Sequence, residues 1–238
     1  NMYDPLVFPS ETGEMQPKLA KSWSVSPDGL HYTFELHEGV KFHDGTELTA
    51  EDVKFSMERA LALQDGYSWL WSGLIKDITV DGPYKVTFHL SNPFAPFIKT
   101  PPWLFIVNKD LIMEHAQPGE FGEFGDYGSN WLNTTTTEDA GSGPYMLKSW
   151  NRGGEIVFER FNDYWEGWPH GDKSIDEVHN LFITNSATVK TMLRKGELTI
   201  TDYYRNYAEY QAMAKFPGVE IVEFPFTEVI SFKLNTKK

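Results

Sequence analysis

Hydrophobic and polar residues alternate along residues 31–37, which places the apolar side chains on one face of an extended chain. This period of two residues predicts a half-buried strand. Two further alternating segments, 74–80 and 84–90, flank an Asp-Gly-Pro turn at residues 81–83. They predict a β-hairpin, because Asp-Gly turns commonly join antiparallel strands.

A helix is predicted to follow Thr49. This residue places a hydroxyl at the N-cap position, and Asp52 stands three residues further on, as in a capping box. Apolar residues then recur at helical spacing on one stripe: Val53, Met57, Ala60 and Leu61.

The second half of the chain combines one long loop with short elements. Residues 117–143 are rich in Gly, Asn, Thr and acids, which predicts a long loop or a domain crossing. Beyond it, the patterns predict strands at 145–150, 155–160, 198–201, 219–224 and 229–234, and helices at 187–195 and near 208–215. Strands and helices are mixed without regular βαβ alternation, so the predicted fold class is mixed α/β, of the α+β kind.

The composition is that of a folded, acidic protein. The 238 residues are 40% hydrophobic and 15% aromatic, and they carry a formal net charge of -13. Such a chain is not expected to bind nucleic acid, which requires Lys and Arg to replace phosphate counterions, or an anionic membrane surface. It has no cysteine, which excludes disulfides and thiolate chemistry.

The ends of the sequence do not look like the ends of a domain. No apolar run approaches the roughly 20 residues that cross a bilayer, and no secretory signal opens the sequence. The first residues, 1–4, are polar, and residues 231–238 alternate like a strand before they stop. Both ends therefore resemble the interior of a longer chain.

A search for catalytic and metal-binding patterns predicts neither function. The seven histidines include no pair at the i, i+4 spacing of a zinc-binding helix, and His37 and His43 are interpreted as a surface pair beside a turn. There is no Gly-x-Ser-x-Gly elbow and no phosphate-binding loop, and the Gly-Ser-Gly run at 141–143 is interpreted as a turn because Pro144 lacks an amide donor. A carbohydrate-binding or carbohydrate-active protein with paired carboxylates is the alternative, because acids are numerous and Trp-rich clefts suit sugars.

Two aromatic clusters stand in predicted loops. Tyr67-Ser68-Trp69-Leu70-Trp71 lies between the predicted helix and the hairpin, and Tyr203-Tyr204-Arg205-Asn206-Tyr207 follows a predicted strand. Rigid amphipathic rings in loops suit ligand recognition, because they bury a large area at low entropic cost. The other interpretation is that these rings fill the core, and the sequence leaves both open.

Residues 17–61 read PKLAKSWSVSPDGLHYTFELHEGVKFHDGTELTAEDVKFSMERAL. This stretch closely resembles the peptide/nickel class of ABC-importer solute-binding proteins, extracellular solute-binding family 5. Further matches follow in the order of that family: Tyr3-Asp4-Pro5-Leu6-Val7, Gly141-Ser142-Gly143-Pro144-Tyr145, Asn162-Asp163-Tyr164-Trp165-Glu166-Gly167 and Lys195-Gly196-Glu197-Leu198. The resemblance spans essentially the whole chain.

The resemblance implies a periplasmic-binding-protein-like fold of the class II type. Residues 1–23 and 119–238 would form a discontinuous domain I, with residues 24–118 inserted as domain II. Family members are longer and carry a signal sequence and a third domain that supplies the other half of the ligand cleft. The chain is therefore expected to hold domains I and II, with the second lobe missing.

The family's pocket implies eight ligand-binding positions. They come from the loop after the Tyr-Asp-Pro-Leu-Val motif, the stretch after the first helix of domain II and the loop after the Gly-Glu-Leu strand. These positions are Phe8, Pro9, Ser10, Tyr67, Trp69, Trp71, Asp202 and Tyr203. The latter two loops coincide with the aromatic clusters, whereas Asp44 and Asp52 are expected to be structural.

The resemblance implies the extracytoplasmic solute-binding component of an ABC importer. The protein would be a monomer that closes its lobes over a ligand and then docks on a membrane permease. It would lie in the periplasm or at the extracellular face of the membrane, secreted or lipid-anchored, and no enzymatic activity, cofactor or metal is implied. Peptides are the expected ligands, because extended backbones suit aromatic-lined clefts, and nickel, haem, opines and oligosaccharides are the other ligand classes in the family.

Overall fold

The computed structural model describes residues 2–202 and 205–222. The chain forms two compact units, Asn1–Leu181 and Phe182–Lys238. The predicted domain boundaries, after residues 23 and 118, both lie within the first unit. The division into domains I and II stays a prediction.

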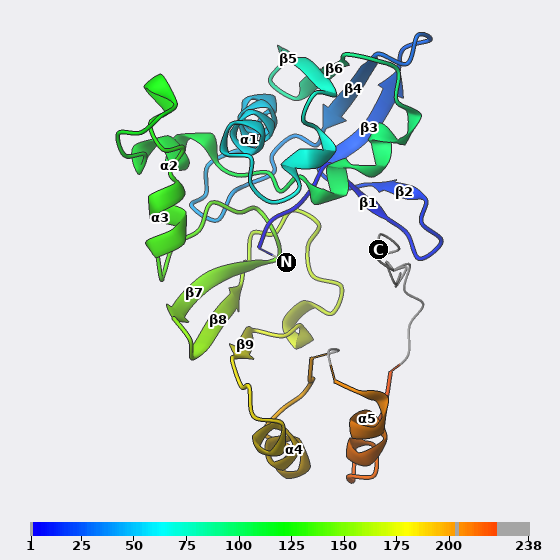
Figure 1. Cartoon of the computed structure of the whole chain (residues 1–238), viewed down its shortest axis with the longest axis vertical. Helices are drawn as coiled ribbons and strands as arrows, with labels where there is room; N and C mark the ends of the chain where they lie inside the picture. Colours follow the sequence, from blue (N-terminus) through cyan, green and yellow to red (C-terminus); the bar gives the residue numbers. More distant parts are fainter. Residues whose placement is uncertain (1, 203–204, 223–238) are drawn as a thin grey trace, which may run out of the picture. The chain divides into compact units, whose positions relative to one another are not determined.

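An antiparallel sheet of four strands, in the order β3-β4-β6-β5, belongs to the first unit (Figure 1). Its strands are β3 (Ala20–Val25), β4 (His31–Leu36), β5 (Ile75–Gly82) and β6 (Lys85–Leu90). Tyr32, Phe34 and Leu36 are buried, while the residues between them are half-buried or exposed. The predicted strand and hairpin are therefore confirmed, and the predicted boundary after residue 23 falls inside β3.

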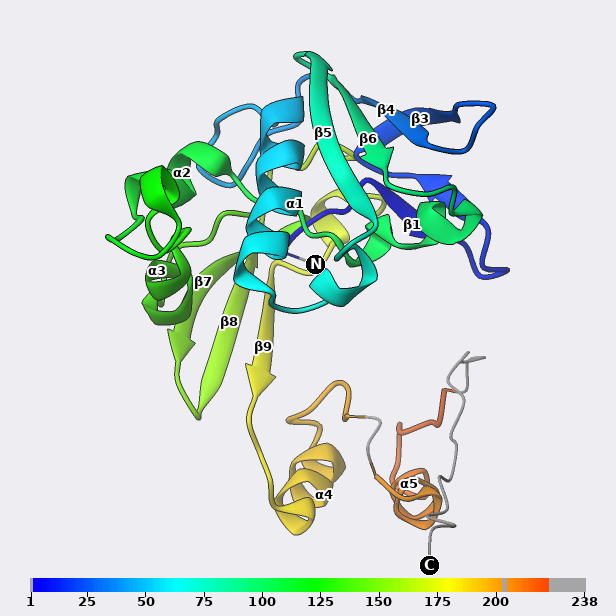
Figure 2. The same ribbon diagram turned by 45° about the horizontal axis from the view of Figure 1, so that its top comes forward.

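Helix α1 (Ala50–Leu63) packs on β5 and β6 (Figure 2). The backbone N–H of Thr49 donates to Oδ2 of Asp52 at 2.8 Å, which confirms the predicted helix start. Val53 and Met57 are fully buried in the same core as the inner face of the sheet. The helix ends at Gln64, which has a left-handed φ of 52°.

Short elements connect this sheet with the N-terminal segment. Strands β1 (Val7–Pro9) and β2 (Met15–Pro17) pair as a hairpin. The short helices of this region are η1 (Ser68–Leu70), η2 (Ala95–Lys99), η3 (Pro101–Trp103) and α2 (Lys109–Glu114). Leu6 and Leu19 share one hydrophobic core with Phe34, Phe88 and Ile106, so this core holds the N-terminal hairpin against the sheet.

The long loop predicted at residues 117–143 contains two helical segments, η4 (Gly122–Phe124) and α3 (Ser129–Thr134). The loop prediction is wrong for α3. Trp131 and Leu132 pack against buried Ile112 and Tyr127 in a second hydrophobic core. Tertiary packing thus stabilises a helix that the Gly- and Thr-rich composition does not favour.

A second antiparallel sheet contains β7 (Tyr145–Asn151), β8 (Glu155–Arg160) and β9 (Glu177–Leu181), in that order. Strands β7 and β8 confirm the two strands predicted here. The sequence does not predict β9, which follows η5 (Gly171–Lys173) and exposes four of its five residues. An edge strand of this kind has no buried face to produce an alternating pattern.

The second unit contains α4 (Ser186–Lys195) and α5 (Tyr207–Met213). Asn185 caps α4 by accepting the N–H of Thr188 at 3.0 Å, and Gly196 ends it with a φ of 73°. The two predicted helices are confirmed. The strands predicted at 198–201 and 219–224 are wrong over the described residues, which are irregular there, and residues 229–234 lie outside the described residues.

Candidate functional site: an exposed aromatic surface

Six large aromatic side chains of the first unit are exposed to solvent, among them Phe94 and Phe105, and four of the six belong to three segments that lie near one another. The exposed fraction is 70% for Trp69, 55% for Phe8, 47% for Trp103 and 40% for Tyr67. Large rings are usually buried, so exposed rings that gather in one place indicate a surface for binding.

The fold brings two of these rings, Tyr67 and Trp103, into contact, and the other two belong to segments beside them. The ring centroids of Tyr67 and Trp103 lie 4.5 Å apart at an interplanar angle of 37°. Helix η3, which ends at Trp103, lies beside β1, which contains Phe8. Trp69 belongs to η1, directly after Tyr67 and Ser68. We call Phe8, Tyr67, Trp69 and Trp103 the aromatic surface.

Trp71 has a different environment from Trp69, although only Leu70 separates them. Its side chain is 1% exposed, and its Nε1 donates to Oγ1 of Thr100 at 2.9 Å. The one-turn helix η1 places the two indoles on different sides of the chain. Core packing accounts for Trp71, and we therefore leave it out of the aromatic surface.

The turn after β1 positions two more of the expected residues. Ser10 N–H donates to the carbonyl of Glu14 at 2.7 Å, and Ser10 Oγ accepts the N–H of Glu14 at 3.2 Å. Ser10 therefore closes the β1–β2 turn, and Phe8 and Pro9 are exposed directly before it.

The remaining expected residues lie in the second unit. Asp202 is exposed, and its Oδ2 accepts from Nη2 of Arg205 at 2.7 Å. Its carbonyl oxygen accepts from the hydroxyl of Tyr210 at 2.8 Å. Tyr203 lies outside the described residues.

Trp103 is the residue of the aromatic surface that sequence reasoning missed. It follows Pro101 and Pro102, which indicate only that regular structure ends there. The two prolines mark a rigid connection, but the sequence does not show that the ring after them is exposed. Its contact with Tyr67 depends on the tertiary path of the chain.

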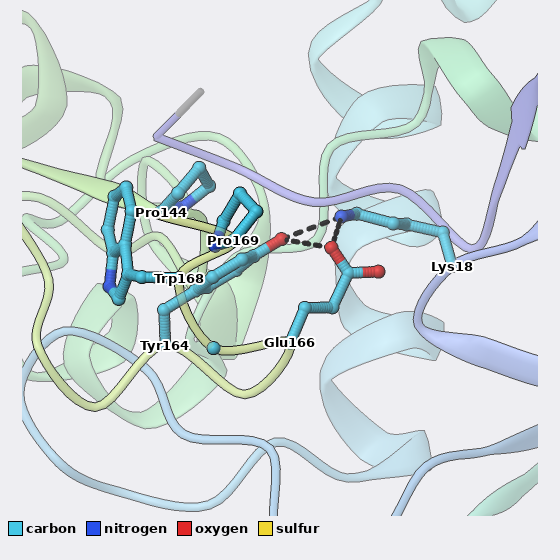
Figure 3. A pocket seen from close by; sticks show the side chains of 7 residues that line it. Lys18, Pro144, Tyr164, Glu166, Trp168 and Pro169 are labelled. Atoms are coloured by element: carbon cyan, nitrogen blue, oxygen red, sulfur yellow. Dashed lines mark hydrogen bonds and ion pairs between the residues drawn. The ribbon is translucent and has the colours of Figure 1, made fainter. Parts of the chain in front are cut away.

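A cavity of about 530 Å³ lies at another place in the first unit, lined by Lys18, Tyr164, Glu166, Trp168 and neighbouring Gly and Pro residues. Figure 3 shows the Lys18 ammonium between the Tyr164 hydroxyl, at 2.6 Å, and the Glu166 carboxylate. The hydroxyl of Tyr164 also donates to Oε2 of Glu166 at 2.8 Å. The charged groups on this wall therefore satisfy one another.

The same lysine approaches a buried carboxylate. Nζ of Lys18 lies 3.6 Å from Oδ1 of Asp4, whose Oδ2 accepts from Nε1 of Trp165 at 3.0 Å. Burial raises the pKa of Asp4, and the Trp165 hydrogen bond and the Lys18 charge partly offset this shift. Burial, followed by the charge of Asp4, also raises the pKa of Tyr164. This cluster joins the segments 3–7 and 162–167 as scaffold.

Two acids, one before α1 and one in its first turn, also have structural partners. Oδ2 of Asp44 accepts from Nδ2 of Asn108 at 2.8 Å, and Oδ1 of Asp52 accepts the N–H of Lys109 at 2.9 Å. Burial raises the pKa of Asp52. The interpretation of His37 and His43 as a surface pair is wrong, because the His43 side chain is only 3% exposed and half-buried His37 packs on Trp165.

Within residues 2–202 and 205–222, no group of three or more His, Asp or Glu side chains is arranged to hold a metal ion. In the same part of the chain, no helix is both long enough and apolar enough to cross a membrane.

Comparisons with known proteins place this fold in one family. Residues 14–238 match the family model of bacterial extracellular solute-binding proteins, family 5, middle region. The chain is 33% identical over 229 residues to the probable D,D-dipeptide-binding periplasmic protein DdpA of Escherichia coli K12. That alignment covers 94% of this chain and 41% of the relative.

Solved structures show the same fold. The periplasmic binding protein AgaA of A. tumefaciens R10, in complex with agropinic acid, has a TM-score of 0.74 and 30% identity, and the match covers 91% of this chain and 40% of that protein. The periplasmic protein DppA of Helicobacter pylori, in complex with the peptide STSA, has a TM-score of 0.70 and 31% identity, with 91% and 43% covered. These matches confirm the predicted mixed α/β periplasmic-binding-protein fold. The chain spans about two fifths of the length of the relatives it matches.

Proposed function

This chain belongs to the bacterial extracellular solute-binding proteins of family 5, and we propose on that basis that it is part of the extracytoplasmic solute-binding component of an ABC importer. The protein captures a small ligand outside the cytoplasm and delivers it to a membrane permease. The proposed ligand is a short peptide. No covalent chemistry belongs to this role.

The exposed rings of the aromatic surface are the observation that supports a peptide as the ligand. Phe8, Tyr67, Trp69 and Trp103 are exposed by 40% to 70%, although each is large enough to belong in a core. A ligand that covers such rings removes apolar area from water, at about 25 cal/mol per Å². Because a peptide offers apolar side chains along an extended backbone, it suits a surface built from rings of three separate segments.

We propose that a peptide also contacts β1, the strand beside this surface. Within the described residues, β1 pairs with β2 on one edge and with no strand on the other. An extended peptide adds to an open strand edge through main-chain hydrogen bonds, while neighbouring pockets select its side chains. The exposed ring of Phe8 in β1 provides such a side-chain contact.

Delivery follows from closure of two lobes over the ligand. A ligand that binds the closed form better shifts the population toward it, and the permease then recognises that form. The names of the relatives support peptides, since one is described as a D,D-dipeptide-binding protein and another is solved with the peptide STSA. The complex of AgaA with agropinic acid makes small acidic solutes the first competing class.

A thermal-shift screen of the purified gene product that contains this chain tests the proposal. The panel holds dipeptides, tripeptides, agropinic acid, oligosaccharides and Ni²⁺. We expect at least one peptide to raise Tm saturably, because a ligand at a hundred times its Kd stabilises by about 2.7 kcal/mol. Stabilisation by oligosaccharides alone would overturn the ligand class, and peptide hydrolysis would overturn the binding role.

A further inference from the structure

The outer face of the four-stranded sheet carries two histidines that point at each other. His31 of β4 is directly opposite His89 of β6, and their Nδ1 atoms lie 2.8 Å apart. Successive side chains of a strand point to opposite faces, so both rings face away from the core that holds Tyr32 and Phe88. The His31 side chain is 45% exposed, so the pair is open to solvent.

A hydroxyl group holds the outer nitrogen of the His89 ring. Nε2 of His89 lies 2.9 Å from Oγ1 of Thr79. The Thr79 hydroxyl donates its only proton to Asp81, so it accepts from Nε2 of His89. The Nδ1 atom of His89 is then left with its lone pair directed at His31.

A carboxylate lies near the outer nitrogen of the His31 ring. Its Nε2 lies 3.9 Å from Oδ2 of Asp28, and the other oxygen of that carboxylate accepts the N–H of Leu30 at 3.0 Å. Histidines that bind metals usually direct the second ring nitrogen at a carboxylate, hydroxyl or carbonyl, which fixes the tautomer and the ring orientation. Thr79 occupies this position for His89, whereas Asp28 lies near Nε2 of His31 without a hydrogen bond to it.

We propose that His31 and His89 form a chelating site, through their Nδ1 atoms, for a divalent first-row ion of the Cu²⁺, Ni²⁺ and Zn²⁺ group. Two nitrogens that each lie about 2.0 Å from one ion, at about 90–110° to each other, are about 2.8–3.3 Å apart. The observed 2.8 Å matches the lower end of this range, which corresponds to the near-90° angles of Cu²⁺ and Ni²⁺. The ion takes the place of the proton between the rings and lies to one side of the line that joins the two nitrogens, so each ring turns from its metal-free orientation to direct its Nδ1 lone pair at the ion.

The remaining coordination positions fall to water, since the described part of the chain offers no cluster of three such side chains. Other histidines with close partners do not present a lone pair. His43 and His179 each have both ring nitrogens within hydrogen-bond distance of oxygen acceptors. The proposed site is built from β4, β5, β6 and the turn before β4. None of these segments belongs to the aromatic surface.

Titration of the tag-free full chain with Cu²⁺ and Ni²⁺ tests the site, with isothermal calorimetry for affinity and Cu²⁺ electron paramagnetic resonance for the ligands. We expect one ion per chain and nitrogen hyperfine structure from two imidazoles. His31→Gln and His89→Gln should each weaken binding by at least about tenfold and remove one imidazole from the spectrum. Thr79→Val should weaken binding by about tenfold with both imidazoles retained.

His179→Gln is the matched control, because His179 is an exposed strand histidine between two glutamates. It should leave the affinity unchanged. Tm without metal shows whether each variant folds, and the half-exposed His31 position keeps the test valid if His89→Gln unfolds the sheet. Unchanged affinity in folded His31→Gln, or loss of binding in His179→Gln, would overturn the proposal.

Discussion

Oδ1 of Asp139 lies 2.6 Å from Nδ1 of His43, and the two side chains are only 4% and 3% exposed. The carboxylate also accepts the N–H groups of Gly141, at 2.8 Å, and Leu147, at 2.7 Å. Nε2 of His43 lies 2.9 Å from the carbonyl of Gly143. Both ring nitrogens of His43 therefore have an oxygen partner within hydrogen-bond distance. The pair thus fastens the Gly141–Gly143 turn to the loop before α1.

Removing either partner of this buried pair should strongly destabilise the first unit. We expect His43→Ala to lower the free energy of unfolding by about 3–5 kcal/mol, because the Asp139 carboxylate would remain buried without this partner. Urea denaturation followed by circular dichroism measures the change. His179→Ala removes an exposed pair and should change the stability far less, because solvent screens ion pairs at the surface. Equal effects of the two variants would contradict the role given to His43.

Gly141 should not tolerate a side chain. A Cβ atom at this position would lie 2.0 Å from the carbonyl oxygen of Met2, which accepts the N–H of Gly143 at 2.9 Å. We expect Gly141→Ala to destabilise the protein by at least about 1–3 kcal/mol, because the backbone must move apart. Gly82→Ala is the control, since no atom lies within 4 Å of its Cβ position. A Tm for Gly141→Ala equal to that of Gly82→Ala would show that the turn adapts freely.

His179 should titrate at a higher pH than an ordinary histidine. Its Nδ1 lies 2.6 Å from Glu155 and its Nε2 3.2 Å from Glu177, and the hydrogen bond with Glu155, followed by that with Glu177, raises its pKa. Because folding raises the pKa of His179, its hydrogen bonds stabilise the folded state most at a pH below the pKa that His179 has in the unfolded chain. This contribution is lost as the pH rises through the folded value.

Nuclear magnetic resonance titration of the His179 ring checks this shift. Glu155→Gln should lower the pKa of His179 more than Glu177→Gln does, because Glu155 is the larger cause. Glu35→Gln, on the other sheet, should leave it unchanged. A titration midpoint that does not respond to Glu155→Gln would rule out this pairing in solution.

The fold could be predicted where burial on one side produced a clear pattern. Residues 31–37 alternate because one face of β4 is buried, and Thr49 with Asp52 marks the start of α1. Strand β9 and helix α3 had no such pattern. Most of β9 is exposed, and α3 depends on Trp131 and Leu132 packing against residues that are distant in sequence.

The sequence indicates which segments form the candidate site, but it does not show which of their side chains are exposed or in contact with one another. The aromatic residues at 67–71 indicate a recognition loop, but the sequence does not show which indole enters the core. That outcome depends on the Thr100 hydroxyl, which accepts from Trp71, 29 residues away. Trp103 likewise acquires its role only through the ring contact with Tyr67.

Trp69 and Trp71 provide the sharpest test of the aromatic surface, because replacement by Ala should weaken ligand binding at Trp69 and lower the stability of the fold at Trp71. Trp69→Ala removes a ring that is 70% exposed, and Trp103→Ala removes one that is 47% exposed. In the gene product that contains this chain, we expect each to weaken peptide binding by about 2 kcal/mol or more, with little change in Tm. Trp71→Ala removes a buried ring and should lower the free energy of unfolding by about 3–5 kcal/mol.

Kd and Tm measured on the same three variants separate the two roles. Trp71→Ala is studied well below its Tm, where an intact aromatic surface should retain the affinity of the parent protein. Trp71→Phe keeps an aromatic ring in the core but loses part of the buried volume and the hydrogen bond to Thr100, so its stability should lie between those of Trp71→Ala and the parent protein. A large loss of Tm in Trp69→Ala or Trp103→Ala with unchanged affinity would mean that these rings stabilise the fold and do not contact the ligand.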